Sequence, residues 1–265
     1  MSEGVELVDL TPGNLEQYRG PTCFLDPKHE GARARLDWTG DRFSEGLKIK
    51  LLVSRADGKT VALIEYIPGE HAWRAVDAHG YLFIHCIWVY PKKNKELGYG
   101  SLLVRECIED AADGGKLGAA VVTSEGPVMA GRELFEMNGF VSIAEAKPSY
   151  RLMVPALRKG PLPSFRDREA RLAALRGLHV VYSDQCPLVA RSIPALAEVA
   201  GEFGLDLQVT RATSAEEAQA APSVYGVFAL VYNGKLLADH YLSTTRFRNI
   251  LNKEGLGGAP REARD

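Results

Sequence analysis

Two glycines stand just before a predicted helix in the segment Lys95–Ser101, which reads KELGYGS. An apolar strand is predicted before this turn, over Tyr81–Tyr90, and a helix after it, over Ser101–Asp113. The first amides of a helix have no partner within the helix, so they bind phosphate, and glycine lets a ligand approach the backbone closely. The segment predicts a phosphate-binding turn, although a plain strand-to-helix turn explains the glycines equally well.

A cysteine stands at the start of another predicted helix, in VVYSDQCPLVARS. The helix N-terminus would lower the pKa of the Cys186 thiol, which makes it a candidate reactive thiol. The other cysteines are Cys23, Cys86 and Cys107, and we expect the last two to be core thiols. None of the four has the spacing of a zinc site or of a disulfide framework, so no metal is expected.

The first part of the chain alternates strands and helices in the order β-α-β-β-β-α-β-α-β-β. Tyr81–Tyr90 is apolar on both faces, which is typical of a central strand. Leu47–Ser54 and Thr60–Ile67 are predicted to form a hairpin. The other predicted strands are Val5–Leu10, Ala119–Thr123, Phe140–Ile143 and Tyr150–Val154, and the other helices are Thr11–Tyr18 and Gly131–Asn138.

The segment Leu152–Arg168 carries three prolines, as a junction between domains often does. The pattern then begins again as β-α-β-α-β-β-α, with a hairpin across Asn233-Gly234. These elements are Leu178–Ser183, Pro187–Phe203, Leu205–Arg211, Ser214–Ala220, Val227–Tyr232, Lys235–Tyr241 and Thr244–Lys253. We predict an α/β (α+β) protein with domains over 1–158 and 176–254, a junction over 159–175 and a flexible tail over 255–265.

The composition excludes several classes of protein. The 265 residues, 46% of them apolar, suffice for two domains. The 32 basic and 34 acidic residues give a net charge of -2, without the basic excess of a nucleic-acid binder. The sequence shows neither a signal peptide nor an apolar run of membrane-spanning length. We therefore expect a cytoplasmic protein that binds no nucleic acid and no membrane.

The segment VYPKKNKELGYGSLL resembles the acetyl-CoA-binding motif of the GNAT acyltransferases, Gln/Arg-x-x-Gly-x-Gly/Ala. Gly98 and Gly100 fit this motif, whereas Lys95 departs from it. The later segment LFEMNGFVSI resembles the helix and strand near the acetyl-CoA site of that family, and the order of elements matches. The resemblance covers roughly residues 5–155 and implies the GNAT acyl-CoA N-acyltransferase fold, with acetyl-CoA as co-substrate.

The resemblance implies that acetyl-CoA lies against the central strand. The backbone of Trp88 and Val89 would pair with pantetheine, and an N–H near Val89 would polarise the thioester carbonyl. The amides of Leu97–Ser101 would hold the pyrophosphate. The full set of implied cofactor-binding residues is Trp88, Val89, Lys95, Glu96, Leu97, Gly98, Tyr99, Gly100, Ser101 and Phe135.

Direct attack on the thioester requires a neutral amine, so a base or a water path must remove a proton. In many family members an acidic residue on the central strand is the base. His85 stands at the comparable position, with Glu65 and Glu70 as alternatives. A histidine packed in an apolar strand is the competing interpretation of His85.

Family members often carry a tyrosine that protonates the leaving thiolate, and Phe135 stands in its place here. Tyr150, Tyr99 or water would take over this role, or the thiolate leaves without help. The acceptor pocket is expected to involve Cys23, Phe24, Trp73 and Arg74. Arg74 would hold a carboxylate of the acceptor, or else it is a surface charge.

The second half resembles a thioredoxin-like domain over residues 176–254. Val189 stands where the second cysteine of a redox motif belongs, and Phe228 where a cis-proline is expected. With SDQCP, AQAAPS and FRNIL in this half, the chain resembles the YoaP-type proteins, bacterial GNAT enzymes with a C-terminal YoaP domain.

Two functions follow from these features. The first is an acetyl-CoA-dependent N-acetyltransferase, which transfers acetyl to an amine by direct attack in a ternary complex. Its partner would be a small-molecule amine or a protein amine, and a homodimer is also considered. The second is a thiol-based binding or sensing protein that uses Cys186 and retains a degenerate acyl-CoA-binding domain.

Overall fold

The computed structural model describes residues 4–18, 25–26, 28–126, 129–155 and 158–256. Its larger sheet has seven strands in the order β1-β2-β3-β5-β6-β8-β7. All neighbours in this sheet are antiparallel except β5 and β6. The strands are β1 (Val5–Asp9), β2 (Lys48–Ser54), β3 (Thr60–Pro68), β5 (Tyr81–Val89), β6 (Gly118–Thr123), β7 (Phe140–Ala146) and β8 (Tyr150–Pro155).

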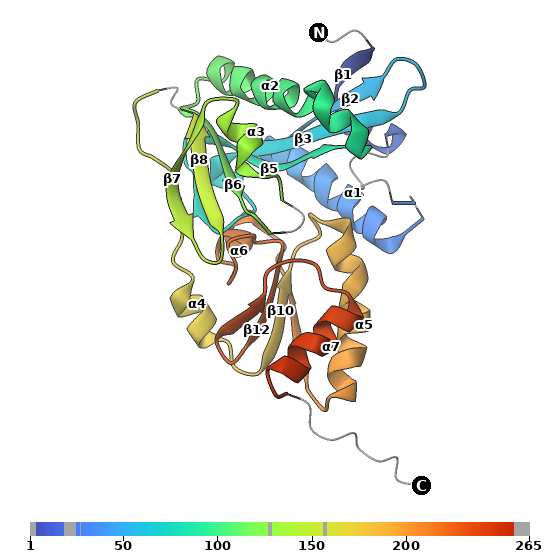
Figure 1. Ribbon diagram of the computed structural model, residues 1–265, viewed down its shortest axis with the longest axis vertical. Coiled ribbons are helices and arrows are strands. Elements are labelled where there is room, and N and C mark those ends of the chain that lie inside the picture. The colour runs from blue at the N-terminus through green and yellow to red at the C-terminus, as the bar shows by residue number, and fades with distance from the viewer. Residues whose placement is uncertain (1–3, 19–24, 27, 127–128, 156–157, 257–265) are drawn as a thin grey trace.

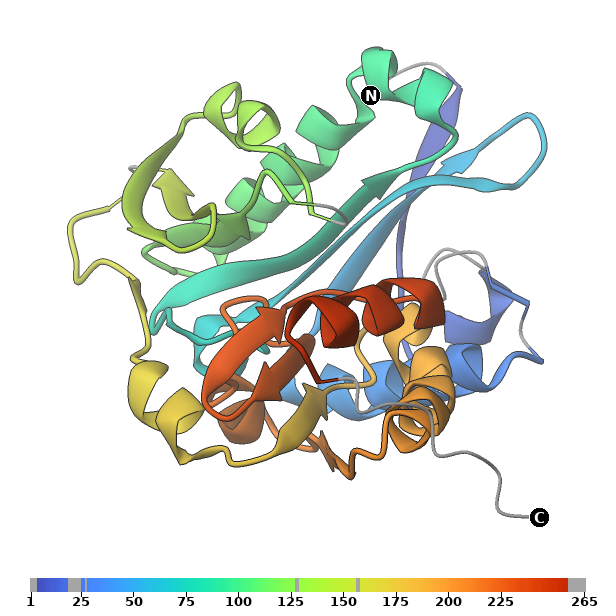
Figure 2. The ribbon, with the colours of Figure 1, turned by 60° about the horizontal axis from the view of Figure 1, so that its bottom comes forward.

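Helices cover both faces of the seven-stranded sheet, as Figures 1 and 2 show. Side chains alternate along each strand, so Leu52 packs toward α2 (Tyr99–Asp113) and α3 (Arg132–Glu136), while Leu51 packs toward Trp38 of α1 (Glu30–Arg42). Apart from the short strand β4, the elements follow the predicted order β-α-β-β-β-α-β-α-β-β, which confirms the predicted α/β (α+β) fold class.

The first helix lies elsewhere than predicted. Residues Thr11–Tyr18 contain only a 3-10 turn, η1 (Leu15–Gln17), and the helix of this part is α1. The sequence of α1, EGARARLDWTGDR, has few apolar residues. Its buried face is formed instead by small and amphipathic side chains, including Arg35 and Trp38. Further 3-10 turns are η3 (Phe43–Glu45), η4 (Gly69–His71) and η5 (Lys92–Leu97).

The smaller sheet has four strands in the order β11-β10-β12-β13. β10 is parallel to β11 and antiparallel to β12, and β12 is antiparallel to β13. The elements follow the predicted order: β10 (Leu178–Tyr182), α5 (Pro187–Glu202), β11 (Leu207–Arg211), α6 (Ala215–Gln219), β12 (Phe228–Tyr232), β13 (Lys235–Ala238) and α7 (Thr244–Lys253). We call residues 4–155 and 178–256 the N-terminal and C-terminal halves.

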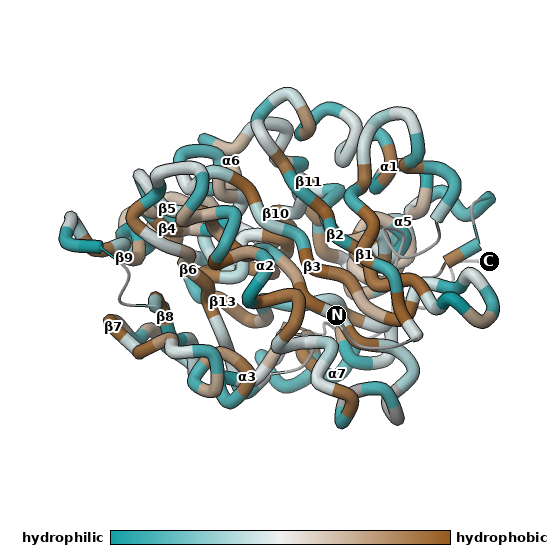
Figure 3. Tube along the Cα trace, turned by 90° about the horizontal axis from the view of Figure 1, so that it is seen from above, coloured by the Kyte–Doolittle hydropathy of each residue, from teal (hydrophilic) through white to brown (hydrophobic). Residues whose placement is uncertain are grey.

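The two halves share one hydrophobic core. A single cluster joins Phe83 and Leu152 of the larger sheet to Val180 and Leu196 of the C-terminal half. Figure 3 shows the hydrophobic segments along the central strands of both sheets, with hydrophilic loops outside them. The halves are therefore packed as one body rather than joined by a free linker.

The segment between the halves is ordered in part. β9 (Ser164–Phe165) pairs with β4 (Val76–Asp77) of the N-terminal half, and α4 (Glu169–Ala174) follows it. The proline-rich composition predicted a junction but gave no sign of this pairing. In the described part of the chain, every helix falls short of the length and apolarity that a membrane span requires.

Helix α1 packs directly against α5, and Gly31 sits at this contact. A Cβ added at Gly31 would lie 2.2 Å from the carbonyl oxygen of Pro187, a distance that atoms do not reach without moving the backbone. Gly40, on the same helix, has nothing within 4 Å of its added Cβ.

We expect Gly31→Ala to destabilise the protein and Gly40→Ala to stabilise it. Alanine favours an exposed helix position by about 1 kcal/mol over glycine, and only at Gly31 does the clash with Pro187 outweigh this gain. Thermal unfolding of both variants measures the difference. A Gly31→Ala variant that melts at or above the wild-type temperature would contradict the close contact between the halves.

Candidate active site at the opening of the larger sheet

The larger sheet opens between β5 and β6. Their pairing runs from Tyr81 opposite Gly118 to Ile84 opposite Val121. β5 continues to Val89 beside β3, whereas β6 continues to Thr123 paired with β8 on its other edge. The backbone edge of β5 that faces β6 thus leaves the ladder after Ile84, and an unpaired strand edge is a template for an extended ligand.

A bulge in β5 lies at the start of this opening. Glu65 of β3 pairs with Cys86, and the next residue, Tyr66, pairs with Ile84, so His85 is an extra residue in β5. A bulge turns side chains away from the regular alternation. Cys86 is exposed here, which corrects the prediction that it is a core thiol, whereas Cys107 is buried as predicted.

The predicted phosphate-binding turn leads into the N-terminus of α2. Gly98 has a left-handed backbone, with φ of 74°, and Leu102 donates its backbone N–H to the Gly98 carbonyl at 3.0 Å. Within the described residues, no side chain caps this helix. Glu96, Leu97 and Gly98 are exposed. The arrangement suits an anion at the first amides of a 15-residue helix.

Gly100 has a packing role that the sequence did not reveal. A Cβ at this position would lie 3.1 Å from Cδ1 of Leu134 in α3. The side-chain amide of Asn138 donates to Ser101 Oγ at 3.0 Å and to the Leu134 carbonyl at 2.7 Å. The Asn-Gly-Phe segment therefore fastens α3 to the first turn of α2.

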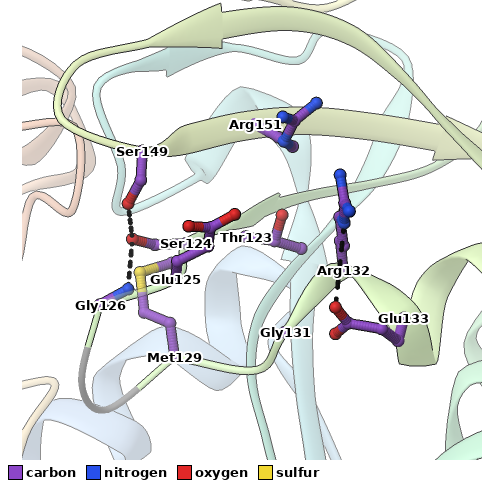
Figure 4. A pocket seen from close by; sticks show the side chains of 10 residues that line it. All are labelled: Thr123, Ser124, Glu125, Gly126, Met129, Gly131, Arg132, Glu133, Ser149 and Arg151. Atoms are coloured by element: carbon purple, nitrogen blue, oxygen red, sulfur yellow. Dashed lines mark hydrogen bonds and ion pairs between the residues drawn. The ribbon is translucent and has the colours of Figure 1, made fainter.

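A hollow of about 240 Å³ lies beyond the end of β6, between α3 and β8. Figure 4 shows Ser124 at its floor, hydrogen-bonded to Ser149 at 2.9 Å and to the Gly126 amide at 3.0 Å. Its lining is polar and of mixed charge: Thr123, Ser124, Glu125, Gly126, Met129, Gly131, Arg132, Glu133, Ser149 and Arg151. The hollow adjoins the opening of the larger sheet between β5 and β6.

Glu65, a predicted catalytic residue, is fully buried at the contact between the halves. Its carboxylate pairs with Arg35 of α1, lies 3.2 Å from Nδ1 of His85, and accepts a hydrogen bond of 2.8 Å from the Gln185 amide. Burial by itself would raise the pKa of Glu65, but the Arg35 charge and these hydrogen bonds lower it below its usual range. Glu65 is therefore an ionised, paired carboxylate.

Both ring nitrogens of His85 are occupied within the fold. The Trp73 backbone N–H donates to Nε2 at 2.9 Å, so Nδ1 carries the proton and donates to Glu65. Burial and the charges of Arg74 and Arg35 lower the pKa of His85 to about 4, against the raising effect of Glu65. His85 is thus a neutral core histidine here, and the prediction that it is the base gains no support.

Glu70 and the residues of the predicted acceptor pocket lie in different places. Glu70 accepts a hydrogen bond from the Gly80 amide at 3.0 Å, next to the other end of β5. Trp73 is fully buried, and Arg74 is 3% exposed. Arg74 donates to the carbonyls of Trp73 (2.7 Å) and His85 (2.9 Å) and to Gln185, which corrects the prediction of a surface charge. Cys23 and Phe24 lie outside the described residues.

Tyr150 and Phe135 face different surroundings. The Tyr150 hydroxyl donates to Asp239 of the C-terminal half at 2.6 Å, and burial and the Asp239 charge raise the pKa of Tyr150 above its usual range. Phe135 is 1% exposed and packs edge-on against Phe140, with ring centroids 5.3 Å apart. In β5, Trp88 and Val89 are half-buried.

Cys186 is the N-cap residue of α5, and its side chain is half-buried. Burial raises its pKa, although the amides of Leu188 and Val189 oppose this effect. The prediction of a lowered pKa from the helix terminus alone is therefore wrong. Among the residues that the structure describes, no group of three or more His, Cys, Asp or Glu side chains is placed to hold a metal ion.

Sequence reasoning missed the polar residues that the C-terminal half contributes. Gln185 reaches Glu65, and Asp239 and His240 meet Tyr150 beside the hollow. Arg35 was missed because its helix was not predicted. The SDQC segment drew attention to its cysteine, whereas the neighbouring glutamine forms the contact with the N-terminal half.

A family model and a curated protein are both similar to this chain. Residues 206–249 match a family model described as YoaP-like. A Bacillus subtilis (strain 168) protein named "Uncharacterized N-acetyltransferase YoaP" is 28% identical over 252 residues, which cover 92% of this chain and 98% of that protein.

Solved structures align with part of this chain. A GNAT-family acetyltransferase from Staphylococcus aureus Mu50 aligns with 14% identity and a TM-score of 0.44, over 58% of this chain and 99% of that one. YncA from Salmonella typhimurium, solved with acetyl-CoA as its cofactor, aligns with 16% identity and a TM-score of 0.43, over 61% and 99%.

The buried pair of Glu65 and His85 makes stability depend on pH. A histidine whose pKa is lowered by folding takes up its proton first in the unfolded state, at about pH 6.5. Stability therefore falls between about pH 6.5 and the folded pKa of about 4, by about 1.4 kcal/mol per pH unit. The lowered pKa of Glu65 adds a further loss below about pH 4.3, where the unfolded carboxyl is protonated.

Urea unfolding between pH 7 and about pH 4.5 measures this slope. We expect His85→Asn to reduce it and the exposed control His71→Asn to leave it unchanged. Equal slopes in wild type and His85→Asn would show that the buried imidazole does not carry the effect.

The element order matches the one on which the GNAT resemblance rests, and the chain is similar over nearly its whole length to a protein that bears the name of an N-acetyltransferase.

Proposed function

We propose that this protein is an acetyl-CoA-dependent N-acetyltransferase. The observation that carries the proposal is the opening between β5 and β6 together with the glycine turn that starts α2. The opening offers an unpaired strand edge for the pantetheine amides, and the glycine turn offers helix amides for a pyrophosphate. The name of the full-length relative supports the same activity.

The cofactor residues follow from this placement. The backbone of Trp88 and Val89 would bind the pantetheine arm, and the amides of Leu97–Ser101 would bind the pyrophosphate. Backbone and exposed turn residues fit acetyl-CoA here because they present amides without a bulky side chain at Gly98. The side chain of Phe135 is buried in the core, so its contribution is to pack α3 against the sheet.

The reaction is direct acetyl transfer in a ternary complex. The neutral acceptor nitrogen attacks the thioester carbon, the C–N bond forms, and the C–S bond breaks with CoA leaving as the thiolate, while a base or water takes the proton that the nitrogen loses. A backbone N–H near Val89 would stabilise the oxyanion. Phe135 has no proton to give to the thiolate, and the Tyr150 hydroxyl already donates its hydrogen bond to Asp239. The leaving thiolate would therefore depart unprotonated or take its proton from water or Tyr99.

We further propose that the C-terminal half is a thioredoxin-like domain without dithiol chemistry, with domain limits at 1–158 and 176–254. Support comes from its strand order, with one parallel and two antiparallel pairs, and from the helix between β10 and β11. Val189 at the second cysteine position and the raised pKa of Cys186 argue against the thiol-sensing alternative.

We propose that the acceptor is an amine, of a small molecule or of a protein. We also propose a cytoplasmic location, which the free thiols of Cys86, Cys107 and Cys186 support, since oxidising compartments favour disulfides. We also propose that the protein can form a homodimer.

Calorimetric titration with acetyl-CoA, and with CoA as comparison, tests the proposal. We expect both to bind, followed by amine-dependent release of CoA when acceptors are added. A folded protein that binds neither ligand would contradict the assignment of the opening as a cofactor site.

Ser101 provides a test of the helix terminus with two opposite effects. A carboxylate in the first turn of a helix stabilises the helix but repels a bound pyrophosphate. We expect Ser101→Asp to raise the unfolding temperature and to weaken acetyl-CoA binding by about tenfold, or about 1.4 kcal/mol. Ser101→Asn is the neutral control, and the difference between the variants should shrink at high salt. Equal affinities of the two variants would place the pyrophosphate elsewhere.

A further inference from the structure

A second, smaller cavity of about 80 Å³ lies between the halves and adjoins the hollow of Figure 4. The two share Ser124, Gly126, Met129 and Ser149 among their lining residues. The smaller cavity adds Pro148 and Tyr150 from the N-terminal half and Tyr225, Asp239 and His240 from the C-terminal half. We call it the interdomain cavity.

Asp239 and His240 form a hydrogen-bonded pair in its wall. Nδ1 of His240 lies 2.9 Å from Oδ1 of Asp239, and the Tyr150 hydroxyl donates to Oδ2 at 2.6 Å. Burial would raise the pKa of Asp239, but the hydrogen bonds from His240 and Tyr150 lower it. The ionised carboxylate therefore keeps the proton of His240 on Nδ1, which leaves Nε2 as a proton acceptor.

Nε2 of His240 is shielded from bulk solvent and has no hydrogen-bond partner among the residues that the structure describes. Its side chain is 15% exposed, and that of Asp239 is 13% exposed. A buried acceptor without a partner calls for an explanation, and a ligand in the adjoining cavity supplies one.

The interdomain cavity is tied to the opening of the sheet through Arg74. The Arg74 guanidinium lies over the ring of Tyr225, 5.0 Å from its centroid, and donates to the carbonyl of the bulge residue His85 at 2.9 Å. Arg74 thus contacts both the cavity wall and the start of the unpaired stretch of β5.

We propose that the interdomain cavity binds the primary amine acceptor and that His240 is its general base. This rests on the acetyltransferase function proposed above. The acceptor nitrogen gives a proton to Nε2 of His240 and forms the C–N bond with the thioester carbon. The C–S bond breaks, CoA leaves as the thiolate, and the imidazolium releases its proton to solvent. Asp239 is a positioning residue that fixes the tautomer of His240.

The structure offers a competing explanation, in which the bond between Tyr150 and Asp239 only joins the halves. The two explanations differ in what a change of His240 does. Loss of a joint lowers stability and cofactor affinity together. Loss of a base lowers kcat alone, and a free imidazole that enters the vacated space restores it.

The test measures CoA release from acetyl-CoA with n-butylamine, L-lysine and spermidine as acceptors. We expect His240→Ala to lower kcat about 100-fold or more, with the unfolding temperature and the Kd for acetyl-CoA unchanged, and imidazole in the buffer to restore part of the rate. Asp239→Asn should lower kcat without changing the acetyl-CoA Kd, because an amide stabilises the wrong tautomer. The exposed His79→Ala is the control and should behave as wild type.

An unchanged kcat in His240→Ala, or a loss that imidazole does not rescue and that accompanies a lower unfolding temperature, would overturn the proposal. So would a wild-type protein that binds acetyl-CoA but acetylates none of the three amines. Failure of the wild-type protein to bind acetyl-CoA at all is a separate outcome, which would overturn the proposed function on which this inference rests.

Discussion

The buried carboxylate of Glu65 is the interaction on which the rest of the structure depends. It has no exposed surface, and its partners come from three separate elements: Arg35 from α1, His85 from the bulge in β5 and Gln185 from the C-terminal half. A buried charge that loses one such partner costs several kcal/mol, about 3–5 in typical cases. Through these contacts Glu65 joins α1 and the C-terminal half to the central strands of the larger sheet.

This assembly decides where chemistry takes place. The bulge that brings His85 to Glu65 lies where the pairing of β5 with β6 ends after Ile84, next to the strand edge that we propose as the cofactor site. Arg74 occupies the space between the halves and holds the His85 carbonyl. The C-terminal half, positioned by Gln185, then closes one wall of the interdomain cavity with Asp239 and His240. In this account, the C-terminal half completes the acceptor side of the site.

The sequence predicted the regular elements well because their signals are local. Strand alternation and the glycine turn located β2, β3, β5 and α2, and the Asn-Gly hairpin located β12 and β13. Helix α1 was missed because its buried face uses Arg35 and Trp38 rather than an apolar stripe. The bulge at His85 leaves no mark on the hydrophobic pattern, so the exposure of Cys86 was not predictable, whereas a packed histidine was one of the two interpretations of His85. Asp239 is 89 positions from Tyr150, and only tertiary packing brings them together.

The central claim is that both halves build one site around acetyl-CoA. A crystal structure of the full chain with bound acetyl-CoA tests it most directly. We expect pantetheine beside Trp88 and Val89, pyrophosphate at the first amides of α2, and an acetyl group that opens onto the cavity lined by Tyr225 and His240. An acetyl group that is separated from this cavity by intact packing of the two halves would contradict the claim.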